Sequence, residues 1–279
     1  MRHAILMTAY KQPELINRWI DNYAHLFDFY IHIDLKSSVK PNDIHVKDNV
    51  YILKKYKVNW GGGVNHLKAF IELMQLADLK GYDYYRTISA QDWMLPFRLD
   101  TLEKGKSYME WGKLPRPEWK KEHGGFDRIR YYCLYDYWNY KSKPQKYFIK
   151  YMFYIQKGLG IRRKKFPMPL YGGSGYMSLT QEAVTYILSF IRANPMILKR
   201  FEHTFCAEEL IFQTLLMNSP LKDKIINNPL RYMVWPGPKV LDESDYEKIK
   251  QTDSLFIRKI DSNISDKLLK RLENESQSR

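Results

Sequence analysis

The sequence lacks the features that mark several common classes of protein. Cys133 and Cys206 are its only cysteines, too few for a disulfide framework or a cysteine-rich metal site, and consistent with a reducing compartment. No apolar run approaches the roughly 18 residues that a membrane-spanning helix needs. The first residues also lack the basic start and long apolar stretch of a secretory signal. We therefore expect a cytoplasmic protein.

Several motifs that identify large enzyme classes are missing as well. The chain contains no P-loop, no G-x-G-x-x-G and no G-x-S-x-G, which removes the commonest nucleotide-triphosphatase, dinucleotide-binding and serine-hydrolase interpretations. Neither is there an Asp-x-Asp pair in the first half, where the carboxylates of Asp34 and Asp92 each stand alone.

Positive charge is abundant but unevenly distributed. The 279 residues include 45 Lys and Arg against 31 Asp and Glu, for a net charge of +14. Residues 113–171 hold 15 basic and 4 acidic residues, and 15 of the 42 aromatic residues. We call this segment the basic insert. Its composition predicts anionic partners at one place on an otherwise nearly balanced protein.

The apolar pattern outside the basic insert alternates between strands and helices. Apolar runs predict strands at 4–7, 29–33, 50–53, 84–88 and 176–179, and helical spacing predicts helices from Pro13, over 65–79, after Thr180 and from near Ala207. This alternation favours a single α/β domain over 1–279, with a mostly parallel, Rossmann-like sheet covered on both faces. Ligands of such sheets bind at the carboxyl ends of the strands.

Eight segments together resemble one enzyme family. They are HAILMTAYKQPE near the start, FYIHIDLKSS at 29–38, VNWGGG at 58–63, YDYYRTISAQDWMLP at 82–96, GGSGYMSLTQEAV at 172–184, HTFCAEELIFQTLL at 203–216, NNPLRYMVW at 227–235 and SLFIRKID at 254–261. Their order and spacing resemble those of the core-2/I-branching β-1,6-N-acetylglucosaminyltransferases, glycosyltransferase family 14, in a bacterial-type form. The resemblance covers nearly all of the chain except the basic insert.

The resemblance implies a GT-A-like fold and an inverting transfer of sugar from a UDP-sugar to a hydroxyl of a glycan acceptor. It implies no metal and no other cofactor, so cationic side chains must neutralise the departing diphosphate. The family's Arg and Lys for this task match Arg231 and Lys259. Thr8, Tyr10 and Asp34 are expected near the nucleotide. If a metal were needed, Asp34, Asp92 and DESD at 242–245 would be the places to look.

The family's general base matches Glu209, the second carboxylate of CAEEL. Adjacent helical residues point about 100° apart, so we expect Glu208 and Glu209 to face different directions, with Glu208 as an acceptor contact. The Asp-aromatic pair of the family matches Asp92 and Trp93 at the junction of donor and acceptor, although Ala90 replaces a glycine there and Pro96 is displaced. Ser174, between glycines that permit close backbone approach, is expected to contact the acceptor.

The transferred sugar is expected to be N-acetylglucosamine, with xylose, glucose or a galactose form as alternatives, in the synthesis of a bacterial surface polysaccharide. The acceptor is a glycan, with a lipid-linked glycan as one form. Residues 146–165 suit docking on an anionic membrane surface at its inner face. The basic insert alternatively roofs the active site or is a solvated face. The rivals from other classes are a nucleic-acid-binding protein, which the eight segments do not favour, and a glycan-binding relative without activity.

Overall fold

The computed structural model describes residues 2–61, 63–95, 98–99, 102–119 and 125–277. Gly62 and Pro96, which belong to two of the quoted motifs, lie outside the described residues, as do residues 120–124 of the basic insert. In the described part of the chain, every helix is too short or too polar to cross a bilayer.

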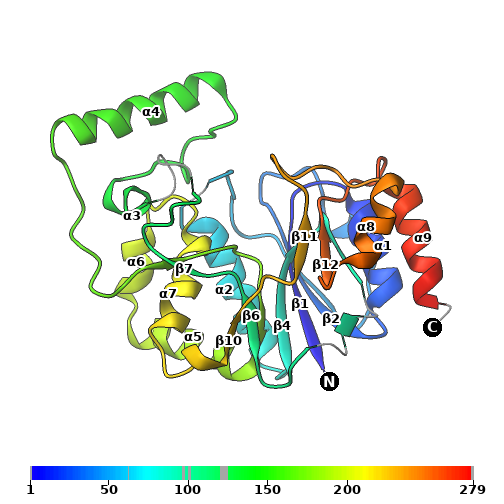
Figure 1. Cartoon of the computed structure of the whole chain (residues 1–279). Helices are drawn as coiled ribbons and strands as arrows, with labels where there is room; N and C mark the ends of the chain where they lie inside the picture. The colour runs from blue at the N-terminus through cyan, green and yellow to red at the C-terminus, as the bar shows by residue number, and fades with distance from the viewer. Residues whose placement is uncertain (1, 62, 96–97, 100–101, 120–124, 278–279) are drawn as a thin grey trace.

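A seven-stranded sheet forms the centre of the molecule (Figure 1). Its strand order is β10-β6-β9-β4-β1-β2-β3. These strands are β1 (His3–Ala9), β2 (Phe27–Ile33), β3 (Val50–Leu53), β4 (Tyr84–Ser89), β6 (Ser107–Met109), β9 (Ser178–Thr180) and β10 (Ile225–Asn227). All neighbouring pairs are parallel except the two that β9 makes with β4 and β6. The expected mostly parallel sheet is therefore confirmed.

Helices cover both faces of the sheet. One face packs against α2 (Asn65–Asp78), α5 (Gln181–Ala193) and α7 (Ile211–Met217), with α6 (Met196–Phe201) beside them; the other packs against α1 (Pro13–Tyr23), α8 (Tyr246–Gln251) and α9 (Asp266–Gln277). Leu6 of β1 enters the first core, whereas its neighbours Ile5 and Met7 enter the second. This alternation explains why the central strand is apolar at successive positions.

The predicted elements outside the basic insert agree with the structure, with one correction. Strands and helices lie where the apolar pattern predicts them, and the Thr180 hydroxyl accepts a hydrogen bond from the Ala183 amide at 3.4 Å, as an N-cap should. The helix expected from near Ala207 is present but begins later: Ala207–Glu209 form a short 3-10 turn, and α7 begins only at Ile211. The candidate base therefore lies in a tight turn that precedes the helix.

A second, three-stranded sheet lies beside the main one and is not predicted by the apolar pattern. It has the order β11-β12-β5, from β11 (Arg231–Met233), β12 (Phe256–Arg258) and β5 (Asp92–Met94). The antiparallel register of β12 and β5 places Arg258 opposite Asp92. This sheet therefore brings β11 and β12, from the C-terminal part of the chain, next to the segment that follows β4.

The basic insert leaves the core and returns to it at one place. Its ends pair as the antiparallel strands β7 (Gly112–Lys113) and β8 (Tyr171–Gly172). Between them lie α3 (Asp127–Arg130) and α4 (Lys143–Gly158), and Figure 1 shows α4 standing apart from the sheet. Asp136 fastens the insert to α2, because its carboxylate accepts hydrogen bonds from the backbone amides of residues 63–65 at 2.9–3.3 Å.

Candidate active site

Polar residues gather where parallel strands of the main sheet end. Thr8 lies near the end of β1, Asp34 follows β2 and Ser89 ends β4. The Asp34 carboxylate is buried and accepts hydrogen bonds from the amides of Lys36 at 2.9 Å and Val58 at 3.3 Å. The structure therefore brings these predicted site residues to one edge of the sheet.

Tyr10 extends this edge toward the basic insert. Its ring is 46% exposed, and its hydroxyl donates a hydrogen bond to Gln91 at 3.3 Å. The ammonium groups of Lys11 and Lys141 lie 6.0 and 5.9 Å from the centre of the ring. Because Lys141 belongs to the basic insert, the insert contributes charge directly to this edge.

Asp92 is the buried anion of the site. Its carboxylate has no exposed surface, and it accepts hydrogen bonds from the Ser89 amide at 2.6 Å and from Arg231 Nε at 3.0 Å, with Arg258 at 3.4 Å. Burial alone raises the pKa of such a group, but the two guanidinium groups and the Ser89 hydrogen bonds outweigh it and hold the Asp92 pKa below its ordinary value of 3.8. Asp92 is therefore ionised in the folded protein at neutral pH.

Arg231 still has donors to offer after pairing with Asp92. Its two terminal nitrogens are buried and have no hydrogen-bond partner among the described residues. Its guanidinium lies 4.6 Å from the centre of the Tyr176 ring, and burial lowers its pKa. Unmet buried donors are costly, so this arrangement is suited to an anion that accepts from both nitrogens.

Lys259 lies among other cations. Burial lowers the pKa of its ammonium group first, and repulsion from Lys11, Arg258 and Lys141 lowers it further. Four positive side chains from three distant parts of the chain therefore converge at this end of the sheet. A polyvalent anion such as a diphosphate would relieve their repulsion.

Glu209 lies on the other side of the candidate site. Its Oε2 accepts a hydrogen bond from Arg128 Nη1 at 2.6 Å, and its side chain is 32% exposed. Loss of solvent raises the Glu209 pKa above its ordinary value of 4.5; Arg128 opposes this shift and Glu208 adds to it. The Arg128 guanidinium carbon also lies over two aromatic rings, 3.8 Å from the centre of Trp119 and 5.0 Å from that of Phe205.

Glu208 is connected to the first strand through a histidine. Its Oε1 lies 3.0 Å from His66 Nδ1, and His66 Nε2 lies 3.4 Å from the Thr8 hydroxyl. The other oxygen, Oε2, is buried and has no hydrogen-bond partner within the described part of the chain. The acidic pair and the end of β1 therefore form one connected polar group.

Glu208 and Glu209 contact different partners, His66 and Arg128, although their carboxylates lie close together. One oxygen of each carboxylate and the sulfur of Cys206 lie within 4.8 Å of one another. This is the group of described residues that best matches a cation site by distance. However, burial raises the Cys206 pKa well above 9.0, so the thiol is protonated, and Arg128 already pairs with Glu209.

Four of the other carboxylates that were candidates for a metal site have partners of their own. The Lys239 ammonium group lies 2.7 Å from Asp245 and 3.8 Å from Asp242 of the DESD segment. Asp34 accepts backbone hydrogen bonds, and Asp92 pairs with arginines. These contacts favour structural roles for all four.

A glycine-containing loop joins the two sides of the site. A Cβ on Gly173 would lie 1.8 Å from the Glu110 carbonyl oxygen, and a Cβ on Gly175 would lie 3.0 Å from Glu208 Cγ. Between them, the Ser174 hydroxyl accepts a hydrogen bond from the Tyr176 amide at 3.2 Å. Tyr176 then packs against Arg231 and Arg258. The loop therefore places the acidic pair next to the cations.

Trp93 does not occupy the position that the motif predicts for a ligand contact. It has no exposed surface and packs against Trp19 and Tyr23, with ring centres 5.3 and 5.4 Å apart. The reason is the alternation of β5, which directs Asp92 toward the cations and its neighbour toward the opposite face. Trp93 supports the site from the core.

The comparison with known proteins gives the identity of the chain. A family model described as the core-2/I-branching enzyme matches residues 4–261. The chain belongs to this family. The resemblance expected from the eight segments is thereby confirmed.

Two relatives of this core-2/I-branching family member are named xylosyltransferases. Xylosyltransferase 2 of the dog, Canis lupus familiaris, is 24% identical over 285 residues, which cover 88% of this chain and 30% of the relative. Xylosyltransferase 1 of the mouse, Mus musculus, is 22% identical over 309 residues, covering 95% of this chain and 29% of the relative. This family member therefore spans about 30% of the length of these curated relatives.

Several residues of the site were not predicted from the sequence. They are His66, Arg128, Tyr176 and Arg258, each of which contacts a predicted site residue. Arg258 precedes Lys259 in a quoted motif. Alternation along a strand, which turns neighbouring residues to opposite faces, would have marked it as a second cation to consider. Arg128 had no local signal, because its partner lies 81 residues away.

The buried Asp92 should make this family member acid-sensitive in a specific way. Because its folded pKa is lowered, its stabilising contribution is fully present above the ordinary carboxyl value near 4 and is lost as the pH falls below it. Asp92→Asn should lower the free energy of unfolding by about 3–5 kcal/mol at pH 7, because it leaves two guanidinium groups without their anion.

Urea denaturation from pH 3 to pH 7 measures this effect. The difference between wild type and Asp92→Asn should be constant above pH 5 and shrink below pH 4. Exposed Asp48→Asn is the control and should match wild type throughout. A difference that does not depend on pH would show that the lost stability is steric.

Proposed function

We propose that this protein is an inverting, metal-independent glycosyltransferase with a GT-A-like fold, which transfers a sugar from a UDP-sugar to a hydroxyl of a glycan acceptor. One observation supports it above all. A group of cations, among them Arg231 with two unmet donors, and a carboxylate of raised pKa lie on two sides of a single loop at the carboxyl edge of the sheet. An inverting transfer needs this pair of groups: one for the leaving diphosphate and one for the attacking hydroxyl.

The cationic side is assigned to the donor. The terminal nitrogens of Arg231 and the Lys259 ammonium would hold the diphosphate and stabilise the charge that develops as it leaves. Thr8, Tyr10 and Asp34 lie at the ends of the first two strands, where the nucleoside of the donor would bind. Arg258 holds Asp92 and thereby orients Arg231.

The acidic side is assigned to the acceptor. Glu209 would take the proton of the attacking hydroxyl, and its raised pKa brings it closer to the neutral range in which a general base works best. Arg128 fixes the direction of the carboxylate through the 2.6 Å hydrogen bond. Glu208 and Ser174 would contact other hydroxyls of the acceptor.

N-acetylglucosamine and xylose are the sugars to test first. The family resemblance favours N-acetylglucosamine, and the relatives named xylosyltransferases favour xylose. Glucose and a galactose form follow. The proposed setting remains the synthesis of a bacterial surface polysaccharide. Release of UDP from a panel of UDP-sugars, with and without a glycan acceptor, tests the proposal and identifies the sugar.

Glu209→Gln should retain UDP binding but lose about 10²- to 10⁴-fold in kcat, because the amide keeps the shape and cannot accept the proton. In wild type, kcat/KM should fall as the pH drops through the Glu209 pKa, at a pH above 4.5, and this acid limb should be missing from the residual activity of the variant. Product formation followed by mass spectrometry measures both.

The matched control for Glu209→Gln is the same change at its neighbour. Glu208→Gln should affect the KM of the acceptor more than kcat. If Glu208→Gln were inactive and Glu209→Gln active, the general base would be Glu208 and the proposed assignment to Glu209 would be wrong.

Turnover should survive EDTA, because cationic side chains meet the charge of the leaving UDP. Lys259→Met should lower kcat by about 10- to 10²-fold and weaken UDP binding, and Mn²⁺ should not restore it. Exposed Lys248→Met is the control with the same loss of charge. An enzyme inactivated by EDTA and restored by Mn²⁺ would instead direct attention to Cys206, Glu208 and Glu209.

The outer face of α4 supports a second proposal, that the protein docks on an anionic membrane surface. Tyr147 and Tyr151 are 70% and 65% exposed, and Leu159 just after the helix is 71% exposed. Exposed Arg162, Lys164 and Lys165 follow in the chain. Aromatic and apolar side chains beside cations are typical of interfacial helices.

Replacing Arg162, Lys164 and Lys165 with Ser should release the protein from vesicles that contain anionic lipid, and added salt should do the same to wild type. Arg163 stays unchanged, because it donates hydrogen bonds to the Arg200 carbonyl and the Thr204 hydroxyl. Sedimentation with phosphatidylserine vesicles measures binding. The control replaces Lys104, Lys222 and Lys248 with Ser. If the control protein is released to the same extent, binding depends on the net charge of the protein and not on this surface.

A further inference from the structure

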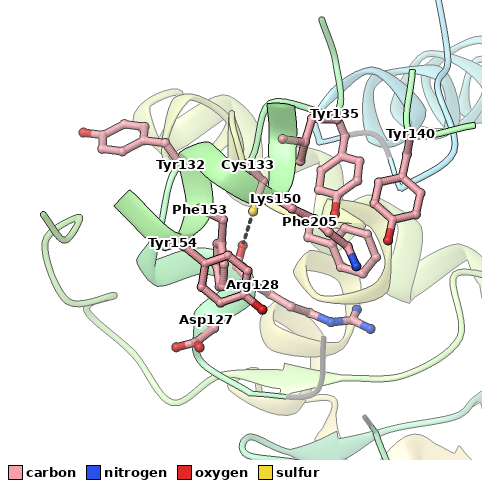
Figure 2. Close-up of a pocket in the computed structure, with 11 residues that line it drawn as sticks. Asp127, Arg128, Tyr132, Cys133, Tyr135, Tyr140, Lys150, Phe153, Tyr154 and Phe205 are labelled. Carbon is pink, nitrogen blue, oxygen red and sulfur yellow. Dashed lines mark hydrogen bonds between the residues drawn. The ribbon is translucent and has the colours of Figure 1, made fainter. Parts of the chain in front are cut away.

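A pocket that is open to solvent lies between α4 and the rest of the molecule (Figure 2). We call it the insert pocket. Its walls come from α3, from residues 132–140, from α4 and from Phe205. Asp127, Arg128, Tyr132, Cys133, Tyr135, Tyr140, Ile149, Lys150, Phe153, Tyr154 and Phe205 line it. All but Phe205 belong to the basic insert.

The insert pocket adjoins the candidate base through one shared side chain. Arg128 lines the pocket, and its Nη1 lies 2.6 Å from Glu209 Oε2. The rings of Trp119 and Phe205, whose centres lie 3.8 and 5.0 Å from the guanidinium carbon, help to keep it in this place. A ligand that presents a hydroxyl to Glu209 can therefore extend past Arg128 into the pocket.

The lining combines aromatic faces with polar groups. Six of the eleven residues are Tyr or Phe, and Figure 2 shows the rings of Tyr135, Tyr140 and Phe205 gathered on one side and those of Phe153 and Tyr154 on the other. Four of the six carry hydroxyl groups. Sugar rings present apolar C–H faces and hydroxyl edges, which such a lining matches better than it matches a wholly apolar chain.

The charge of the insert pocket is positive. Asp127 is neutralised by Lys157, whose ammonium group lies 2.7 Å from its carboxylate. Lys150 is exposed and has no ion-pair partner within the described ranges. Arg128 is paired with Glu209, so the charge that the pocket offers comes from Lys150 at its rim, and it favours a sugar that carries a carboxylate.

We propose that the insert pocket is an acceptor subsite, which binds an acidic sugar residue next to the one whose hydroxyl reaches Glu209. The acceptor is then a glycan that contains uronic acid. This inference rests on the proposed function for its meaning, but binding in the pocket can be measured without donor and without turnover.

Calorimetric titration with two tetrasaccharides, anionic tetragalacturonate and neutral cellotetraose, tests the proposal on the full chain. Tetragalacturonate should bind more tightly, and Lys150→Met should weaken it by about tenfold through loss of one charge-assisted contact. Lys143→Met removes the same charge from an exposed position at the start of α4 that does not line the pocket, and should change binding by less than about twofold. Tyr154→Ala should weaken both tetrasaccharides, because its ring is lost.

Equal weakening by Lys143→Met and Lys150→Met, or no binding of tetragalacturonate, would overturn the proposal. Binding of farnesyl phosphate that Tyr154→Ala abolishes, without binding of tetragalacturonate, would overturn it in favour of a lipid tail. UDP release measured on the same proteins separates the two levels. If tetragalacturonate binds in the pocket but no donor gives UDP release, the proposed glycosyltransferase activity is contradicted and the binding site is not. If UDP release is normal but Lys150→Met has no effect on binding, only the proposed subsite is contradicted.

Discussion

The ion pairs of Asp92 hold the candidate site together. One fully buried carboxylate pairs with Arg231 from β11 and with Arg258 from β12, and its own strand β5 completes the small sheet. Without this anion, two guanidinium groups would be buried beside one another, at a cost that short three-residue strands could not offset. The small sheet and the cationic side of the site therefore depend on the same contact.

That contact does not neutralise the site. Asp92 satisfies one nitrogen of Arg231 and leaves the terminal two without partners in the described structure, while Lys259 is repelled by its cationic neighbours. The fold thus holds a surplus of positive charge in a partly desolvated place, where interactions with an anion are stronger than in water. This is how a protein can stabilise a departing diphosphate with side chains alone.

Much of the fold could be predicted from the sequence, because it follows from local patterns. Apolar periodicity located five of the seven strands of the main sheet and four of the helices that cover it, but not β6, β10, α8 or α9; Thr180 was recognisable as a cap. The small sheet could not be found this way, since its three strands are three residues long and far apart in the chain. For the site, the motifs identified Glu209, Arg231 and Lys259 as candidates, but not what orients them.

The errors have local physical causes. Trp93 was assigned to the ligand because it follows Asp92, although neighbours on a strand face opposite ways. The helix expected from near Ala207 begins only at Ile211, because a short 3-10 turn occupies Ala207–Glu209. Neither feature follows from the residue types of a motif alone.

The cap that Asp136 places on α2 connects the basic insert to the acidic pair mechanically. Asp136 holds the first amides of the helix, and His66, which reaches both Glu208 and Thr8, is the second residue of that same helix. A change in the insert around Asp136 would therefore alter the contacts of the first turn of α2, which carries His66. The basic insert differs most from the rest of the chain in composition, and it also helps to hold Glu208 in position through α2 and His66.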